Sequence, residues 1–143
     1  MEHFDYLAPE EALIERLKTH IPDLVDVRGE GSFTTLKETP LESPSALVVY
    51  GGDRLTPSDS DDDSALVHQA WLVVLAVRAP GDRTGVEARH IAGPLIPRIL
   101  STVQGFEPGE RFTKLRRING PRPELLPGGT LFIPFAFETS LVA

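Results

Sequence analysis

The chain has four histidines, the residue type best suited to acid–base or metal chemistry near neutral pH. They are His3, His20, His68 and His90. No two of them stand at the spacing of a metal-ligand pair, and the chain has no cysteine to complete a thiolate site. His68 lies in an extended run and His90 in a helical one, so a strand–helix contact would place a metal-dependent or hydrolytic site between them. The alternative, which the spacing favours, is that the histidines are structural or exposed.

An acidic run lies in a polar stretch of the sequence, and it consists of Asp59, Asp61, Asp62 and Asp63. Alternating carboxylates of this kind open the calcium-binding loop of an EF-hand. That loop needs glycine at its sixth position and glutamate at its twelfth, where this chain has Ser64 and Ala70. Because residues 53–64 also lack hydrophobic periodicity, we predict a mobile acidic surface loop without a dedicated metal site.

Other catalytic signatures do not match the sequence. Gly29 and Gly31 lack the third glycine and the helix of a phosphate-binding loop, and Gly128 and Gly129 lead into a predicted strand without a lysine. There is no G-x-S-x-G motif of a serine hydrolase, and no pair of glutamates is placed to divide acid and base roles. We therefore predict that the chain is not an enzyme and uses no cofactor and no metal.

A basic cluster lies in the last third of the chain, and it consists of Arg111, Lys114, Arg116, Arg117 and Arg122. Its neighbours include Phe106 and Phe112, and arginine beside aromatic rings suits single-stranded nucleic acid. Arginine also suits protein interfaces, because its planar group meets carboxylates with two hydrogen bonds. A third interpretation is plain surface solubility. The net charge of −7 opposes strong nucleic-acid binding, since phosphate contacts need clustered cations.

The charge is divided unevenly along the chain. Residues 1–63 hold 15 acidic and 5 basic side chains, a net −10, whereas residues 64–143 hold 6 and 9, a net +3. A subunit with two unlike charged regions could bind its own copies head to tail. Our hypothesis is that the basic cluster of one copy faces an acidic surface, such as the acidic run, on its neighbour or on another partner.

Length and composition predict one domain over residues 1–143, because 143 residues are too few for two ordinary domains. No apolar stretch approaches the roughly 20 residues of a membrane-spanning helix. The N-terminus is acidic and lacks an apolar core, so we expect no signal peptide and no membrane partner.

Hydrophobic periodicity predicts two helical segments. Residues 9–20 have acidic residues in the first turn and apolar residues at helical spacing. Residues 84–103 begin with Thr84 and Glu87 at the spacing of a capping box. The buried stripe of this second segment is expected to be Ala88, Ile91, Ala92, Leu95, Ile96, Ile99 and Val103. Prolines interrupt the segment, so we expect a kink or break near Pro94.

Strands are predicted over residues 24–28, 46–50, 65–79, 113–119 and 131–141. The segment 65–79 is apolar on both faces past Ala70, which predicts a central strand covered on both sides. Pro134 in the last strand favours a sheet edge or a bulge, and the Pro- and Gly-rich residues 120–130 are expected to form a loop or arm. The predicted fold is an α+β two-layer sandwich, with two main helices on a mostly antiparallel sheet of four to five strands.

Several runs of turn and core residues carry a resemblance to a known family. They are residues 71–78 (WLVVLAVR), 82–85 (DRTG), 92–96 (AGPLI), 99–100 (IL), 105–108 (GFEP) and 135–139 (FAFET). In this order they resemble the tail terminator proteins of tailed bacteriophages, over roughly residues 6–143. The resemblance contains no catalytic motif, so it implies no catalytic residues.

The resemblance implies a compact α/β subunit that forms a hexameric ring on the end of the tail tube. Such a ring stops further tube polymerisation and offers a surface for joining the head. The implied partners are further copies of the chain, the tail tube protein and a head-completion or neck protein, with nucleic acid disfavoured. The implied location is the phage tail in the virion, and the host cytoplasm during assembly. Another phage neck or head–tail adaptor component is the alternative.

Overall fold

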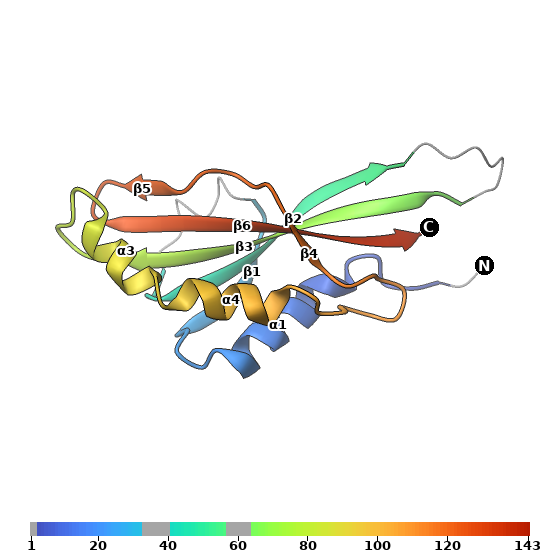
Figure 1. Cartoon of the computed structure of the whole chain (residues 1–143), viewed down its shortest axis with the longest axis horizontal. Helices are drawn as coiled ribbons and strands as arrows, with labels where there is room; N and C mark the ends of the chain where they lie inside the picture. Colours follow the sequence, from blue (N-terminus) through green and yellow to red (C-terminus); the bar gives the residue numbers. More distant parts are fainter. Residues whose placement is uncertain (1–2, 33–40, 57–63) are drawn as a thin grey trace.

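The computed structural model describes residues 3–32, 41–56 and 64–143. These residues form three helices and six strands: α1 (Ala8–His20), β1 (Asp26–Glu30), β2 (Ser45–Leu55), β3 (Leu66–Arg78), α3 (Val86–Ala92), α4 (Leu95–Val103), β4 (Arg116–Ile118), β5 (Glu124–Leu126) and β6 (Thr130–Val142). The helices lie together on one side of a single twisted sheet (Figure 1). The predicted α+β class is confirmed.

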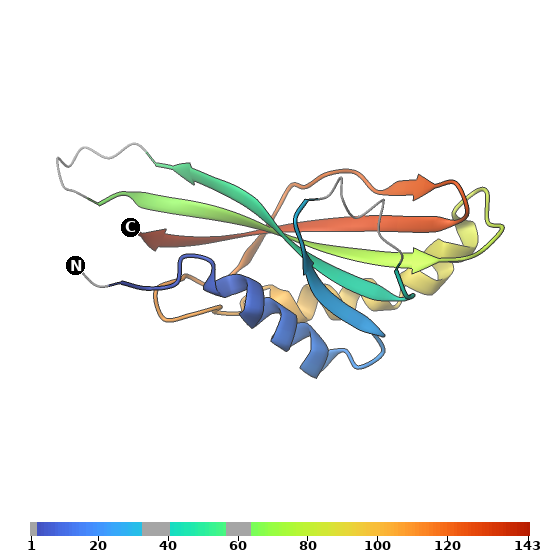
Figure 2. The ribbon, with the colours of Figure 1, turned by 180° about the vertical axis from the view of Figure 1, so that it is seen from behind.

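The sheet has the strand order β1-β2-β3-β6-β4, and β5 pairs with the other end of β6. β1 runs parallel to β2, and the remaining pairs are antiparallel. β3 lies in the middle of this order, as predicted, and pairs with β6 along its whole length from Leu66 to Arg78. The C-terminal ends of β2 and β6 and the N-terminal end of β3 extend together past the helices, most clearly when the molecule is viewed from behind (Figure 2). We call this the outer end of the sheet.

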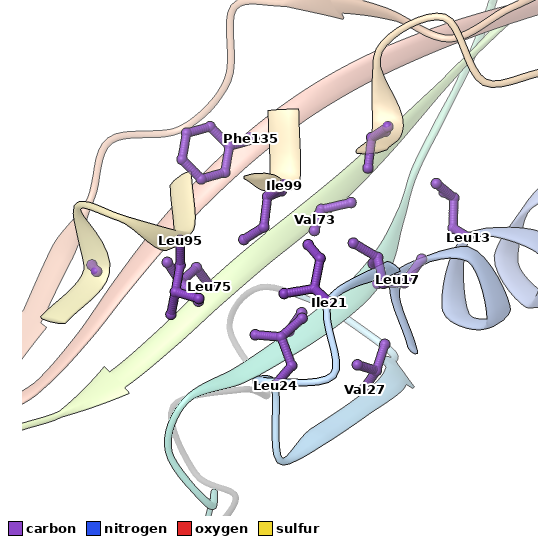
Figure 3. Packing of buried hydrophobic residues seen from close by; sticks show 14 of the residues in the cluster. Leu13, Leu17, Ile21, Leu24, Val27, Val73, Leu75, Leu95, Ile99 and Phe135 are labelled. Carbon is purple, nitrogen blue, oxygen red and sulfur yellow. The ribbon is translucent and has the colours of Figure 1, made fainter. Parts of the chain in front are cut away.

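The main core fills the space between the helices and the sheet. Leu17 of α1, Val73 of β3 and Ile99 of α4 are fully buried and lie close together in it (Figure 3). A smaller cluster on the other face of the sheet contains Val74 and Ala76. Both faces of this part of β3 are therefore covered, as its apolar run predicted. Burial of each large aliphatic side chain contributes about 1.5–3 kcal/mol, so these two clusters supply most of the driving force for folding.

Helix α1 matches its prediction to within one residue. A proline lies in its first turn together with acidic residues that favour the positive end of the helix dipole. Leu13 and Leu17 point into the core. Arg16 joins α1 to the end of α4, because its Nε donates to the carbonyl of Thr102 at 3.1 Å and its guanidinium lies 4.8 Å from the ring centre of Phe106.

The predicted break in the second helical segment is confirmed: α3 ends at Ala92 and α4 begins at Leu95. Pro97 lies in the first turn of α4, where backbone N–H groups have no helical acceptor, so it costs no helical hydrogen bond. The buried face nevertheless keeps one helical spacing across the break, through Ala88, Ala92, Leu95 and Ile99. Ile91 was expected in the buried stripe but is 42% exposed, because it lies at the edge of that face.

The N-terminus of α3 is held by Asp82 and not by the predicted capping box. Asp82 Oδ1 accepts from the backbone N–H groups of Thr84 and Gly85 at 3.1 and 2.9 Å, and Oδ2 accepts from that of Ala88 at 3.1 Å. The hydrogen bond from Ala88 is the main reason that the pKa of Asp82 lies below its usual value. Asp82 therefore provides the N-terminal capping that the spacing assigned to Thr84 and Glu87.

Two strand boundaries near glycines differ from the prediction. β1 includes Gly29 and lies two residues later than residues 24–28. β2 was expected to end at Tyr50, but it continues to Leu55 through a β-bulge between Tyr50 and Asp53. Glycine permits the bulge, because Gly52 has a φ of +89°. The first residues of the predicted acidic loop are therefore strand, whereas the acidic run itself lies outside the described residues.

The C-terminal third also corrects the prediction. β4 is shorter than residues 113–119, and the expected loop at 120–130 contains β5. β6 is an inner strand, so the edge position expected from Pro134 is wrong. On the side away from β3, however, β4 pairs up to Ala136 and β5 pairs up to Phe132, which leaves Pro134 between them. Because proline has no N–H to donate, the second ladder divides at this residue.

Candidate interaction surface

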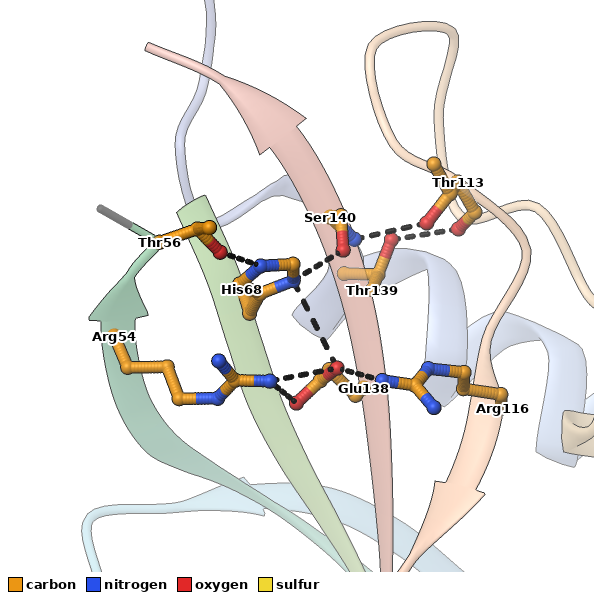
Figure 4. A network of polar contacts seen from close by, with 8 residues as sticks. All are labelled: Arg54, Thr56, His68, Thr113, Arg116, Glu138, Thr139 and Ser140. Carbon is orange, nitrogen blue, oxygen red and sulfur yellow. Dashed lines mark hydrogen bonds and ion pairs between the residues drawn. The ribbon is translucent and has the colours of Figure 1, made fainter. Parts of the chain in front are cut away.

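The face of the sheet opposite α1, α3 and α4 carries a polar network around Glu138 (Figure 4). We call it the helix-free face, because none of the helices formed by residues 3–32, 41–56 and 64–143 lies on it. Arg116 donates to Glu138 Oε1, and Arg54 Nη2 lies 3.4 Å from Oε1 and 3.3 Å from Oε2. The Glu138 side chain is 6% exposed, whereas those of Arg54 and Arg116 are 60% and 66% exposed. We call these three residues the Glu138 clamp. It presents positive charge to solvent, because its two cations are exposed and its anion is not.

The sheet register places both arginines beside the carboxylate. Arg116 of β4 lies directly opposite Glu138 of β6. Arg54 comes from β2 and reaches across β3, where the small side chain of Ala70 lies opposite Glu138 and leaves room. The β-bulge is needed for this arrangement: without the register shift, Arg54 would lie opposite Val67 on the helix side, whereas it pairs with His68 on the helix-free face.

Two opposing effects act on the pKa of Glu138 in the clamp. Burial by itself raises the pKa of Glu138, but the hydrogen bond and charge of Arg116, followed by those of Arg54, outweigh it and hold the pKa below its usual value. The carboxylate is therefore ionised at neutral pH. An ionised buried group of this kind must keep its cations, which fixes the two guanidinium groups in position.

His68 extends the network toward the outer end of the sheet. Its Nδ1 lies 2.7 Å from Ser140 Oγ and 3.8 Å from Glu138 Oε1, and its Nε2 bonds to Thr56 Oγ1. The contact between His68 and His90, which the sequence disfavoured, is not formed, because His68 lies on the helix-free face and His90 belongs to α3 on the opposite side of the sheet. His68 thus serves as a link between strands.

The segment before β4 is fastened to β6 next to this network. Thr139 Oγ1 donates to the carbonyl of Thr113 at 2.6 Å, and the N–H of Ser140 donates to Thr113 Oγ1 at 2.9 Å (Figure 4). These bonds continue the contact between the chain and β6 beyond the three residues of β4. They hold the strand that carries Arg116 against the strand that carries Glu138.

The structure separates the residues of the predicted basic cluster. Arg116 belongs to the clamp, and Arg117 points to the opposite side, with its guanidinium 5.3 Å from the ring centre of Phe135. Arg111 lies 4.5 Å from the ring centre of Phe4. Lys114 and Arg122 are exposed. The cluster is therefore not one continuous patch, and its acidic counterpart in the hypothesis, the acidic run, lies outside the described residues.

Sequence reasoning missed Arg54 and Glu138. A signal for Glu138 was present, because it is the one charged residue in the long apolar segment that forms β6. A carboxylate in such a position is rarely buried without a cationic partner. Arg54 offered no comparable signal, since it was assigned to a polar loop.

Residues 3–32, 41–56 and 64–143 contain no group of three His, Asp or Glu side chains placed to hold a metal ion. Within the same ranges, no helix has the length and apolar character needed to cross a bilayer. A hollow of about 680 Å³ lies where β4 and β5 separate, lined by residues that include Arg117, Pro134 and Phe135.

Comparison with protein families gives one match of nearly full length. The model of the phage tail terminator protein family matches residues 2–143. No match is found among curated proteins. The family describes structural, non-enzymatic proteins of the phage tail that interact with tail and head components. The match covers all the described helices and strands, including those that build the Glu138 clamp. The chain belongs to the phage tail terminator protein family.

Proposed function

We propose that copies of this chain form a hexameric ring on the end of the phage tail tube. The ring ends tube polymerisation and provides the surface to which the head is joined. The observation that carries this proposal is the family match over residues 2–143. Its partners are further copies of the chain, the tail tube protein and a head-completion or neck protein, and it acts in the virion tail after assembly in the host cytoplasm.

The two unlike faces of the subunit support a ring. A cyclic ring is built from heterologous contacts, in which two different patches on each subunit meet. One face of this molecule is a layer of helices, and the other is a sheet surface with exposed arginines. Because the two faces differ in chemistry, contacts between unlike faces of two copies are favoured over a symmetric dimer.

The basic residues predicted from the sequence have separate roles in this proposal. Lys114 and Arg122 are exposed, and we assign them to contacts with an acidic surface of the tube or of a neighbouring copy. Lys114→Glu with Arg122→Glu leaves the Glu138 clamp intact, so the double variant tests these two residues alone. We expect it to bind the tube less tightly while its fold is unchanged, as measured by co-sedimentation with tubes and by circular dichroism. Normal tube binding would contradict this assignment.

The capping function is tested by tube polymerisation. Purified tail tube protein is polymerised with and without this chain, and tube lengths are measured by electron microscopy. We expect shorter tubes whose ends carry a ring, and a ring mass by native mass spectrometry that corresponds to six copies. Tubes of unchanged length without rings at their ends would overturn the proposal.

A further inference from the structure

We propose that the Glu138 clamp is one half of the contact between neighbouring copies, and that the carboxylates of Glu11 and Glu15 on α1 of the next copy are the other half. This inference rests on the proposed ring, because it names the groups that join its subunits. It goes beyond the basic cluster predicted from the sequence, since one arginine of the clamp comes from β2 and lies far from that cluster in the chain.

The clamp is built to accept a carboxylate. Its arginines use part of their hydrogen-bonding capacity on Glu138, and more than half of each side chain stays exposed. A guanidinium has five N–H donors, so further donors of both groups remain for an incoming acid. Because Glu138 holds Arg54 and Arg116 in place, little side-chain entropy is lost when a second carboxylate binds.

Helix α1 offers carboxylates on its outer side. Glu11 and Glu15 are exposed and stand one helical turn apart, whereas Leu13 and Leu17 face the core. Side chains four residues apart on a helix are neighbours, so these two acids form a pair. Lys18 stands one turn after Glu15, but within the described ranges no ion pair joins either acid to a cation, so both carboxylates are available to a partner.

The clamp and the acidic pair lie on opposite sides of the molecule. The clamp is on the helix-free face, and α1 packs on the other face of the sheet (Figures 1 and 2). One copy can therefore offer its clamp to the helix of the next copy while its own helix remains open to a third. This is the heterologous geometry that a closed ring requires.

A second copy is the occupant that charge complementarity favours. Each copy carries a net charge of −7, so two copies repel each other at a distance, and a positive patch is needed wherever they touch. Apolar surface lies farther along the same face, beyond His68 and Ser140: Leu66 and Val142 are opposite each other there and are 41% and 58% exposed. The surface thus combines cations with an apolar border, as protein interfaces do.

A charge exchange between the two sides tests the contact. The first variant, R54E/R116E/E138Q, gives the clamp an acidic character and removes the buried charge that would otherwise be left unpaired. The second variant, E11R/E15R, makes the outer side of α1 basic. Each variant alone is expected to associate at least about tenfold more weakly than the wild type, because like charges then meet. A 1:1 mixture is expected to regain assembly, since each contact again joins opposite charges.

Sedimentation velocity over a concentration series, in solution and on tail tubes, measures the assembly. R78E/R83E is the control. Arg78 is at the end of β3 remote from the clamp and Arg83 lies in the segment that follows, and both are exposed, so this variant should assemble as the wild type does. Circular dichroism verifies that each variant folds. E11R/E15R changes exposed helix residues alone, so it tests the contact even if the clamp variant proves unstable.

The outcomes separate this inference from the proposed function. Loss in each variant and recovery in the mixture supports the contact. Assembly of either variant as in the wild type, or no recovery in the mixture, overturns it while leaving the ring in place. A wild-type chain that neither associates nor caps tubes overturns the proposed function itself. Binding of DNA that requires the clamp, with assembly unaffected in R54E/R116E/E138Q, would assign the clamp to nucleic acid and also overturn the inference.

Discussion

The two faces of the sheet are stabilised in different ways. On the helix side, Trp71, Val73 and Leu75 are fully buried among side chains of α1, α3 and α4, and their contribution depends on area removed from water. The helix-free face has a smaller apolar cluster, and next to it the Glu138 clamp depends on directed hydrogen bonds between three strands. Removal of an apolar side chain therefore costs free energy mainly through lost burial, whereas removal of the two arginines also leaves a buried charge without its counter-ions.

The largest expected effect breaks the helix side. Ile99→Ala removes a fully buried side chain from the core and should lower the free energy of unfolding by about 2–5 kcal/mol. Ile91→Ala is the matched control, because it removes the same atoms from an exposed position in α3 and should change stability by less than about 0.5 kcal/mol. Urea unfolding followed by circular dichroism measures both. Equal losses would mean that the helices pack in a different rotation.

The next effect breaks the helix-free face. Arg54→Met with Arg116→Met leaves the buried Glu138 carboxylate without its two arginines, and should lower the free energy of unfolding by about 2–4 kcal/mol. Glu138→Gln leaves two exposed arginines that water can solvate, and should cost about 1 kcal/mol. The comparison is made by urea unfolding at neutral pH. A larger loss in Glu138→Gln than in the double variant would show that the acid is not the buried member of the clamp.

A smaller change loosens the helix layer at its edge. Asp82→Ala removes three backbone hydrogen bonds at the N-terminus of α3 and one from the Thr84 hydroxyl, and should lower the free energy of unfolding by about 1 kcal/mol. Hydrogen exchange should become faster in α3 before it does so in β3. Glu87→Ala is the control, and should lie within about 0.5 kcal/mol of the wild type because the capping box is not formed. A larger loss of stability in Glu87→Ala than in Asp82→Ala would indicate that the capping box is formed.

The smallest expected effect concerns acid pH. Because Glu138 has a lower pKa in the folded chain than its usual 4.5, its contribution to stability is complete above that value. The contribution is lost as the pH falls through the lower folded-state pKa. The stability difference between the wild type and Glu138→Gln should therefore shrink on acidification, in unfolding curves measured at successive pH values. Screening of the exposed arginines keeps the effect small, and a difference that grows on acidification would contradict the sign.

Features that depend on neighbouring residues were predictable from the sequence. The apolar spacing before Pro22 fixed α1, and the prolines near residue 94 divided the second helical segment, since proline acts on its own turn. The β-branched run that forms β3 predicted a central strand because both of its faces are apolar. These effects are local, so no knowledge of partners was required.

Features that depend on distant partners were not predictable. The clamp brings Arg54 to Glu138 across 84 residues of sequence, and the bulge that turns Arg54 to the correct face leaves no trace in hydrophobic periodicity. Pro134 was placed at an edge because its missing N–H was the only visible constraint. The structure satisfies that constraint by interrupting the second ladder, an option that requires knowledge of β4 and β5.

The full-length pairing of β3 with β6 has a consequence for the order of folding. The residues that pair, from Leu66 with Val142 to Arg78 with Thr130, are separated by long stretches of chain, and such non-local contacts form slowly. During synthesis, α1 and β1 to β3 leave the ribosome well before β6 does. The edge of β3 that later pairs with β6 stays open in that interval, so the sheet is completed only when β6, which follows β4 and β5 in the chain, has been translated.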